Sequence, residues 1–169
     1  RLTGEENPST SLRKAENSVL PFTKGELPKR VIAQRGQTIN LGGGVALEIL
    51  FPDRNVSGLN PNEGSIVAKL IYGSTSFLLT GDTTEAVEEY LARLDGKRLD
   101  VDVLKVGHHG SRTSTSDAFV GLASPAFAVI SAGKENRYGH PHAEVLERLA
   151  RFEIETLGTY ERGTTVFVS

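Results

Sequence analysis

Short apolar runs separated by turn residues dominate the first half of the chain after residue 29. Apolar residues in these runs alternate with polar or small ones, which is the period-two pattern of a β-strand. Pro52 ends one run, and Gly73-Ser74 is a two-residue connection that predicts a hairpin. The pattern predicts strands at residues 30–34, 45–51, 65–72 and 75–80.

The second half of the chain alternates helical and strand patterns. Four apolar residues recur at the spacing of one helix face and predict an amphipathic helix over residues 84–94: Val87, Tyr90, Leu91 and Leu94. Glu85, Glu88 and Glu89 lie near the start of this helix and suit the positive end of its dipole. Apolar runs further along predict strands at residues 101–106, 126–131, 154–159 and 164–168.

Local signals place the remaining segments. Ser114-x-x-Asp117 resembles a capping box that opens a helix over residues 118–123. Residues 1–28 are polar and contain several Pro and Gly residues, so we expect an irregular N-terminal segment with one or two helical turns near residues 12–19. A run of strands followed by alternating helices and strands predicts an α/β fold, a mixed sheet with helices packed on it.

Composition limits the kind of protein. The 169 residues make one domain, and a hydrophobic content of 38% is enough for a core. A net charge of -2 gives no global attraction to nucleic acid or anionic membrane, so anion binding must come from local clusters. The absence of cysteine excludes thiolate-ligated zinc. No apolar run approaches the ~20 residues of a membrane span, and the absence of methionine indicates a piece of a longer protein.

Groups that can bind metal follow two predicted strands. Asp82 follows the strand at 75–80, and His108-His109 follow the strand at 101–106. Ligand sites in α/β folds lie at such strand ends. The residues alone leave alternatives open, because Asp82 also suits a helix cap and the histidines also suit a solvated loop. On extended backbone the two imidazoles would point in opposite directions, so that one binds metal and the other contacts substrate.

Other polar residues lie in neighbouring loops. His140 and His142 flank Pro141 at a predicted helix start, which suits either a phosphate or a helix cap. Asn62 and Ser65 either enter the same site or serve a turn and a strand edge. Four basic residues on or beside these loops form either a local anion-binding rim or ordinary solvated surface: Lys105, Arg112, Lys134 and Arg137.

In combination and in this order, several segments resemble a known family. They are Asn62-x-x-Ser65, Leu78-Leu-Thr-Gly-Asp82, Leu104-Lys-Val-Gly-His-His-Gly-Ser111 and Asn136-x-Tyr-Gly-His-Pro141. They are similar to the metallo-β-lactamase-fold domain of ComEC-type competence (DNA-uptake) proteins, from about Val31 to the C-terminus. The resemblance implies that residues 29–169 are the C-terminal part of an αββα sandwich. It also implies a metal-dependent hydrolase that acts on phosphodiesters, a nuclease linked to DNA uptake.

The resemblance implies roles for single residues. Asp82 would bridge two divalent metal ions, zinc or manganese, and His109 would ligate one of them. His108 and His140 would be catalytic groups that face the substrate. Five residues would bind the substrate: Lys105, Ser111, Arg112, Asn136 and Arg137.

The chain departs from the family in one respect. The family's His-x-His-x-Asp-His segment supplies most of the metal ligands, whereas the four histidines here all lie from residue 108 onward. We therefore expect that the chain begins downstream of that segment and that, as given, it binds metal weakly or not at all. Two alternatives stay open: a non-catalytic module that binds DNA or protein, and a phosphorylcholine-esterase-like activity, against which the few aromatic residues count.

The expected partners follow from the same resemblance. They are DNA or another phosphodiester, the N-terminal part of the same domain, and a second copy paired through an exposed sheet edge. The expected location is the outer face of the membrane, as part of a larger membrane protein, or outside the cell as a secreted protein.

Overall fold

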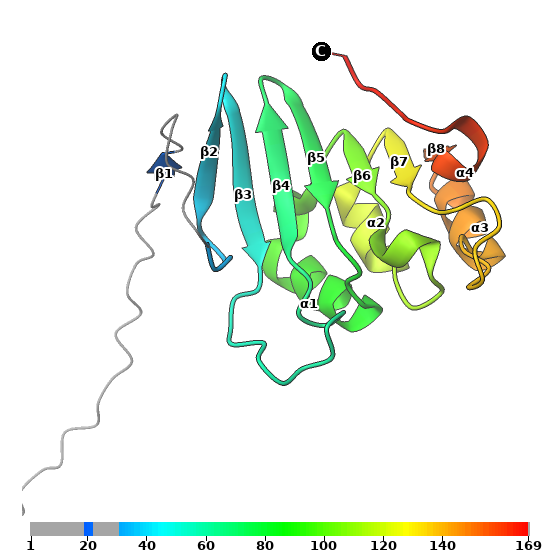
Figure 1. Cartoon of the computed structure of the whole chain (residues 1–169), viewed down its shortest axis with the longest axis horizontal. Helices are drawn as coiled ribbons and strands as arrows, with labels where there is room; N and C mark the ends of the chain where they lie inside the picture. Colours follow the sequence, from blue (N-terminus) through cyan, green and yellow to red (C-terminus); the bar gives the residue numbers. More distant parts are fainter. Residues whose placement is uncertain (1–18, 22–30, 169) are drawn as a thin grey trace, which may run out of the picture.

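A single sheet organises the computed structural model, which describes residues 19–21 and 31–168. The sheet has eight strands whose spatial order is their order in the sequence (Figure 1). The strands are β1 (Val19–Pro21), β2 (Thr38–Gly42), β3 (Val45–Phe51), β4 (Val67–Tyr72), β5 (Thr75–Leu79), β6 (Val103–Lys105), β7 (Phe127–Ile130) and β8 (Glu155–Gly158). The helices are α1 (Glu85–Asp95), α2 (Asp117–Ala123), α3 (Ala143–Arg151) and α4 (Thr159–Arg162), with short 3₁₀ turns η1 (Gly96–Leu99) and η2 (Gly107–Gly110).

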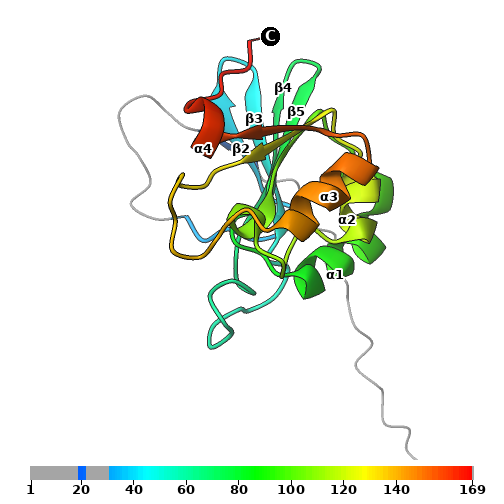
Figure 2. The same cartoon turned by 90° about the vertical axis from the view of Figure 1, so that its right-hand side faces the viewer.

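The direction of the strands changes in the middle of the sheet. Strands β2 to β5 pair antiparallel with one another, and β5 to β8 pair parallel. Parallel crossovers have one hand, and each new strand is added on the same side of the last. Helices α1, α2 and α3 therefore fall on one face of the sheet (Figure 2). This arrangement confirms the predicted α/β fold, a mixed sheet with helices packed on it.

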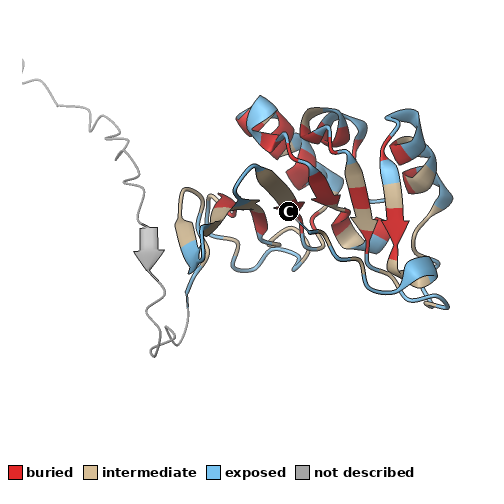
Figure 3. Cartoon of the chain, turned by 90° about the horizontal axis from the view of Figure 1, so that it is seen from above, coloured by how far each residue is buried: buried red, intermediate tan, exposed pale blue. Residues whose placement is uncertain are grey.

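The core lies between the sheet and these helices. Leu78, Leu104 and Ala128 share one register line across β5, β6 and β7, and all three are buried. Buried residues gather between the two layers (Figure 3). On the other face, Phe167 of the C-terminal segment packs edge-on against Phe77 at 5.5 Å.

Several expected elements differ from the structure. Residues 31–34 and 164–168 are not strands, and residues 159–162 form α4 instead of continuing the strand before them. The apolar alternation at 164–168 was misleading, because Phe167 is used for side-chain packing on the sheet and not for strand pairing. Strand β2 was missed, because more than half of its residues are polar or glycine and a glycine-rich turn follows it.

The N-terminal segment and the predicted capping box also differ from expectation. Strand β1 lies within the segment expected to be irregular, and the helical turns expected near 12–19 fall on residues outside the described part, Val19 excepted. Ser114 does not cap α2. Its hydroxyl donates instead to the carbonyl oxygens of Gly107 at 2.9 Å and Ser111 at 3.1 Å, and the cap position belongs to Ser116.

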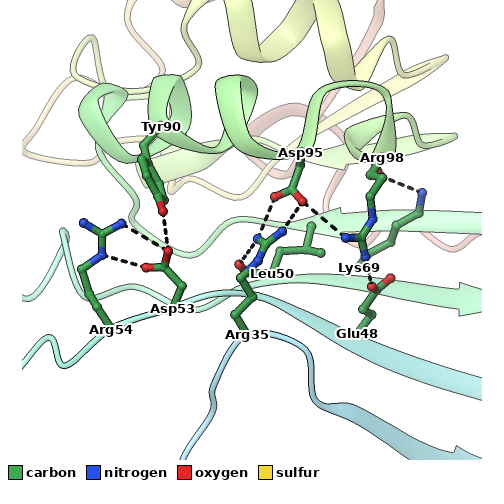
Figure 4. Close-up of polar contacts among 9 residues, drawn as sticks. All are labelled: Arg35, Glu48, Leu50, Asp53, Arg54, Lys69, Tyr90, Asp95 and Arg98. Carbon is green, nitrogen blue, oxygen red and sulfur yellow. Dashed lines mark hydrogen bonds and ion pairs between the residues drawn. The ribbon is translucent and has the colours of Figure 1, made fainter. Parts of the chain in front are cut away.

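A polar network fastens the first strands to the helix layer, away from the ends of β5 to β7 (Figure 4). Arg35 makes a two-pronged ion pair with Asp95 of α1 and donates to the carbonyl oxygen of Leu50 at 2.7 Å. Tyr90 donates to Asp53 beside it. Among the described residues, no helix is long and apolar enough to cross a membrane.

Candidate functional site

Three parallel strands deliver the candidate residues to one edge of the sheet. Asp82 follows β5, the His108-His109 pair follows β6, and Ser131 follows β7. The carboxyl ends of parallel neighbours meet at the same edge, which is where α/β folds hold ligands. The first two loops are tied together directly, because the backbone N–H of His108 donates to the carbonyl oxygen of Gly81 at 3.0 Å.

Asp82 and His109 face each other across this edge. His109 Nε2 lies 3.4 Å from Asp82 Oδ1, and both side chains are about half exposed. His109 Nδ1 lies 2.6 Å from the carbonyl oxygen of Ser131. A carbonyl only accepts hydrogen bonds, so Nδ1 carries a proton, and in the neutral form of the ring the lone pair of Nε2 points towards Asp82. Metal-binding histidines are commonly oriented in this way.

Asp82 and His109 have the chemistry and spacing of metal ligands, but they are too few to complete a metal site. Two ligand atoms on a tetrahedral zinc are roughly 3.4 Å apart when each bond is about 2.1 Å, which agrees with the Asp82–His109 separation. Over residues 19–21 and 31–168, however, no three His, Cys, Asp or Glu residues gather as a metal set. A closed zinc site uses about four ligands. The described residues alone would therefore not complete such a site.

The two histidines do not lie on the extended backbone that was expected. His108 and His109 have φ angles of 46° and 56°, in the left-handed region, within the turn η2. Residues other than glycine adopt this region at a cost, and they keep it where the surroundings hold them. The turn is held by Ser114, and the loop around Ser114 is held by a residue that the sequence did not mark as part of the site.

That residue is Glu88 of α1, which is completely buried. Its carboxylate accepts hydrogen bonds from the backbone N–H groups of Thr115 and Ser116, both at 2.7 Å. Burial raises the pKa of Glu88 to about 7, while these hydrogen bonds act in the opposite direction. Its place in a run of three glutamates indicated only a favourable charge at the helix start, so no sequence signal separated it from Glu85.

The loop between β7 and α3 brings two more histidines over the site. The ring of His140 lies 5.8 Å from that of His108 and 5.1 Å from that of His142, edge to face in both contacts. Burial lowers the pKa of His140, and the neighbouring histidines lower it further. His142, which the sequence placed beside His140 at a helix start but without a role of its own in the site, occupies the cap position of α3. Its spacing from His140 was the one available signal.

Three of the five expected substrate-binding residues lie beside these groups. Lys105 Nζ is 3.4 Å from the carbonyl oxygen of Gly81, next to Asp82, and burial lowers the pKa of this lysine. Arg112 Nη2 lies 3.5 Å from His142 Nδ1. The guanidinium of Arg137 lies 4.8 Å from the centre of the Tyr138 ring. These cations line the rim of the site.

The other two, Ser111 and Asn136, serve the loops themselves. Ser111 is buried, its backbone N–H donates to His108, and its hydroxyl contacts Thr113. The side-chain amide of Asn136 donates to the carbonyl oxygens of Gly133 and His140 at 2.8 and 2.5 Å. Its oxygen accepts from backbone N–H groups of the same loop. Both side chains therefore have protein partners.

The loop between β3 and β4 contributes one contact to the site. The backbone N–H of Asp82 donates to Ser65 Oγ at 3.2 Å, so Ser65 does reach the site edge. Asn62 takes part in the turn before it, where its carbonyl oxygen accepts from the Ser65 N–H. Lys134 is exposed in the loop after β7.

Comparison with known proteins identifies the family to which the sequence is related. Residues 15–134 match the model of the metallo-beta-lactamase superfamily. ComE operon protein 3 of Bacillus subtilis is 44% identical over 103 residues, which cover 61% of this chain and 13% of that protein. Recombination protein 2 of Haemophilus influenzae is 43% identical over 110 residues, which cover 65% of this chain and 14% of that protein.

A third relative is competence protein ComA of Neisseria gonorrhoeae, 37% identical over 124 residues, which cover 73% of this chain and 18% of that protein. The matched regions thus span 13 to 18% of the length of these three relatives. The resemblance to ComEC-type competence proteins is confirmed. Since the family model matches well over half of its residues, the chain belongs to the metallo-beta-lactamase superfamily.

Proposed function

We propose that this chain forms part of the active site of a metal-dependent hydrolase that acts on phosphodiesters, a nuclease in DNA uptake. One observation carries the proposal: Asp82 and His109 face each other at 3.4 Å, with the His109 ring oriented by the Ser131 carbonyl. The names of two relatives, Recombination protein 2 and competence protein ComA, favour DNA as the substrate.

In this proposal Asp82 and His109 would hold a divalent metal. When bound, such an ion acts as a Lewis acid on a phosphoryl oxygen and supplies a nucleophile from water at neutral pH. Lys105 and Arg112 attract and orient the anionic oxygens of the phosphodiester, since both lie at the rim of the pair. His140 faces the substrate, and because its pKa is lowered its neutral ring can accept a proton from the attacking water.

The remaining metal ligands must come from another segment. Each of the three relatives is much longer than the matched region. We expect the N-terminal part of the same domain, in a longer protein that contains this chain, to supply them. A location at the outer face of the membrane would place such a site where incoming DNA arrives.

Metal content and hydrolysis of bis(p-nitrophenyl) phosphate, measured together in that longer protein, test the proposal. Asp82→Ala and His109→Ala should each lower both readouts. Asp102→Ala is the matched control, because this carboxylate lies at the opposite end of β6 and contacts only Ser76 among the described residues. Survival of metal and activity in both site variants would show that the assignment is wrong.

A non-catalytic module that binds DNA or protein is the second candidate. It is favoured by the incomplete metal set in the described part of the chain. In that case the longer protein would bind oligonucleotides or a partner protein without taking up metal, and no variant would change hydrolysis.

A further inference from the structure

A cavity of about 300 Å³ adjoins the Asp82–His109 pair. His109 forms its end nearest Asp82, the rings of Tyr138 and His140 form one wall, and Ala132 and Gly133 lie in its lining. None of the roles proposed above uses this space. Its position beside the expected phosphate site indicates a place for the group attached to that phosphate.

The aromatic wall is built in advance of any ligand. The Tyr138 ring stacks on His140 at a centroid distance of 5.7 Å and an interplanar angle of 25°. Asn136 fixes the loop, because its side-chain oxygen accepts hydrogen bonds from the backbone N–H groups of Tyr138 and His140. Tyr138 is nevertheless 60% exposed as a residue, so the part of its ring that His140 and Arg137 leave open faces a ligand in the cavity.

The lining favours a flat and uncharged group. Ala132 and Gly133 carry little or no side chain, and a Cβ added at Gly133 would meet only the Asn136 Cβ, at 3.8 Å. The amide of Asn136 is already hydrogen-bonded within the loop, so it offers no pattern of donors and acceptors to distinguish one flat group from another. Stacking on an aromatic side chain is tolerant of base identity, because every nucleobase has a π-face.

The charge at the rim argues against a choline group. A quaternary ammonium would also favour an aromatic wall. Here the Arg137 guanidinium already lies 4.8 Å from the Tyr138 ring centre, and this cation would repel a second one. The same guanidinium attracts the phosphate of a nucleotide and can stack beside its base.

We propose that this cavity is a subsite for the nucleobase next to the scissile phosphate, with the base stacked on the Tyr138–His140 wall. The inference rests on the proposed function, which places that phosphate at Asp82 and His109. A base in this subsite has left its neighbours in the nucleic acid, so the substrate is single-stranded or locally unpaired at this nucleotide. The subsite accepts any base.

Four small probes separate the subsite from the phosphate site in NMR titrations of the longer protein that contains this chain, with a divalent metal present. They are thymidine 5′-monophosphate, deoxyribose 5-phosphate, thymidine and inorganic phosphate. The nucleotide should bind about 5- to 150-fold more tightly than deoxyribose 5-phosphate, and its base should shift the ring protons of Tyr138 upfield. Tyr138→Ala should abolish this preference, and Tyr138→Phe should retain it.

Tyr72→Ala is the control, because Tyr72 is another exposed tyrosine but lies at the end of β4 beside the hairpin turn. It should leave all affinities unchanged. Equal binding of the nucleotide and deoxyribose 5-phosphate would overturn the base subsite and leave the phosphate site intact. Thymidine binding that depends on Tyr138, without any phosphate binding, would support the subsite and count against the proposed function. Absence of binding by every probe would overturn both.

Phosphorylcholine is the last probe. If it binds as tightly as the nucleotide, and Tyr138→Ala weakens both equally, the cavity recognises a choline group and the nucleobase assignment is wrong. Weaker binding of phosphorylcholine, unaffected by Tyr138→Ala, is the result that we expect.

Discussion

The carboxylate of Glu88 accepts a 2.7 Å hydrogen bond from the backbone N–H of Thr115, 27 residues away in the sequence. This contact joins α1 to the loop that follows the two site histidines. Arg148 of α3 donates to the carbonyl oxygen of Thr115 at 2.8 Å, so helices on both sides hold the same residue. The backbone of Thr115 has a φ of 64°, a left-handed conformation that these contacts maintain.

Glu88 should make stability fall as the pH rises. Its pKa is about 7 in the folded chain and has an ordinary value of 4.5. The folded state therefore holds the proton more tightly, so the stabilisation is complete below pH 4.5 and is lost as the pH rises to about 7. The total effect is on the order of 3 kcal/mol. Urea unfolding at several pH values measures it.

Glu88→Gln should remove that part of the pH dependence. Glu89→Gln, a change at an exposed glutamate of the same helix, is the control and should leave the slope as in the parent chain. The difference between the parent and Glu88→Gln isolates Glu88, because His140, with its lowered pKa, contributes with the opposite sign in all of these proteins. An unchanged slope in Glu88→Gln would contradict the prediction.

Removing the Ser114 hydroxyl should destabilise the fold. Its single proton is shared between the carbonyl oxygens of Gly107, in the histidine turn, and Ser111, and a buried acceptor left without its partner costs about 1–3 kcal/mol. Ser114→Ala should lower the free energy of unfolding by that amount. Thr83→Val is the comparison, because the buried Thr83 hydroxyl has no hydrogen-bond partner among the described residues and its loss should be neutral or stabilising. Equal effects of the two changes would refute this reading.

Breaking the ion pair of Arg35 with Asp95 should have a large effect. The Asp95 side chain is completely buried, so Arg35→Met leaves its carboxylate without the two-pronged partner and with only the more distant Arg98, at 3.7 Å. The expected loss is about 3 kcal/mol of unfolding free energy. Arg93→Met breaks an exposed pair with Glu89 at 3.8 Å and should cost less than about 1 kcal/mol. Chemical denaturation of both variants tests the difference, and a loss at Arg35 no larger than that at Arg93 would contradict the prediction.

The tautomer of His109 can be observed directly. The contact of 2.6 Å between its Nδ1 and the Ser131 carbonyl oxygen requires the proton on Nδ1 in the neutral ring. ¹⁵N NMR spectra of the histidine side chains should therefore show a protonated Nδ1 and a bare Nε2 for His109. Adding Zn²⁺ should shift Nε2, and Asp82→Ala should weaken that shift. A neutral ring protonated at Nε2 would exclude the proposed orientation.

Much of the fold could be predicted because its strands and helices carry clean periodic patterns. The runs that became β3 to β8 and the apolar stripe of α1 lie within a few residues of their predicted positions. The pattern failed where tertiary contacts decide the structure. Phe167 packs on the sheet face without strand pairing, and Ser114 bonds to the histidine turn where a helix cap was expected.

The candidate site was accessible to sequence reasoning for a related reason. Asp82 and His109 stand directly after buried strands, so their meeting follows from parallel pairing. Glu88 and the Ser131 carbonyl could not be found in this way. Glu88 looks in the sequence like any acidic residue near a helix start. The Ser131 carbonyl is a backbone group that any residue at this position would provide.

The order of the strands in the sheet has a consequence for how the chain is made. Every strand pairs with the strand that precedes it in the sequence. A strand that leaves the ribosome therefore finds its partner already synthesised and needs to close only the loop between them. Such local pairing favours rapid folding. The sheet can grow from its N-terminal edge while synthesis continues, and the edge that carries Asp82 and His109 forms only in the later steps.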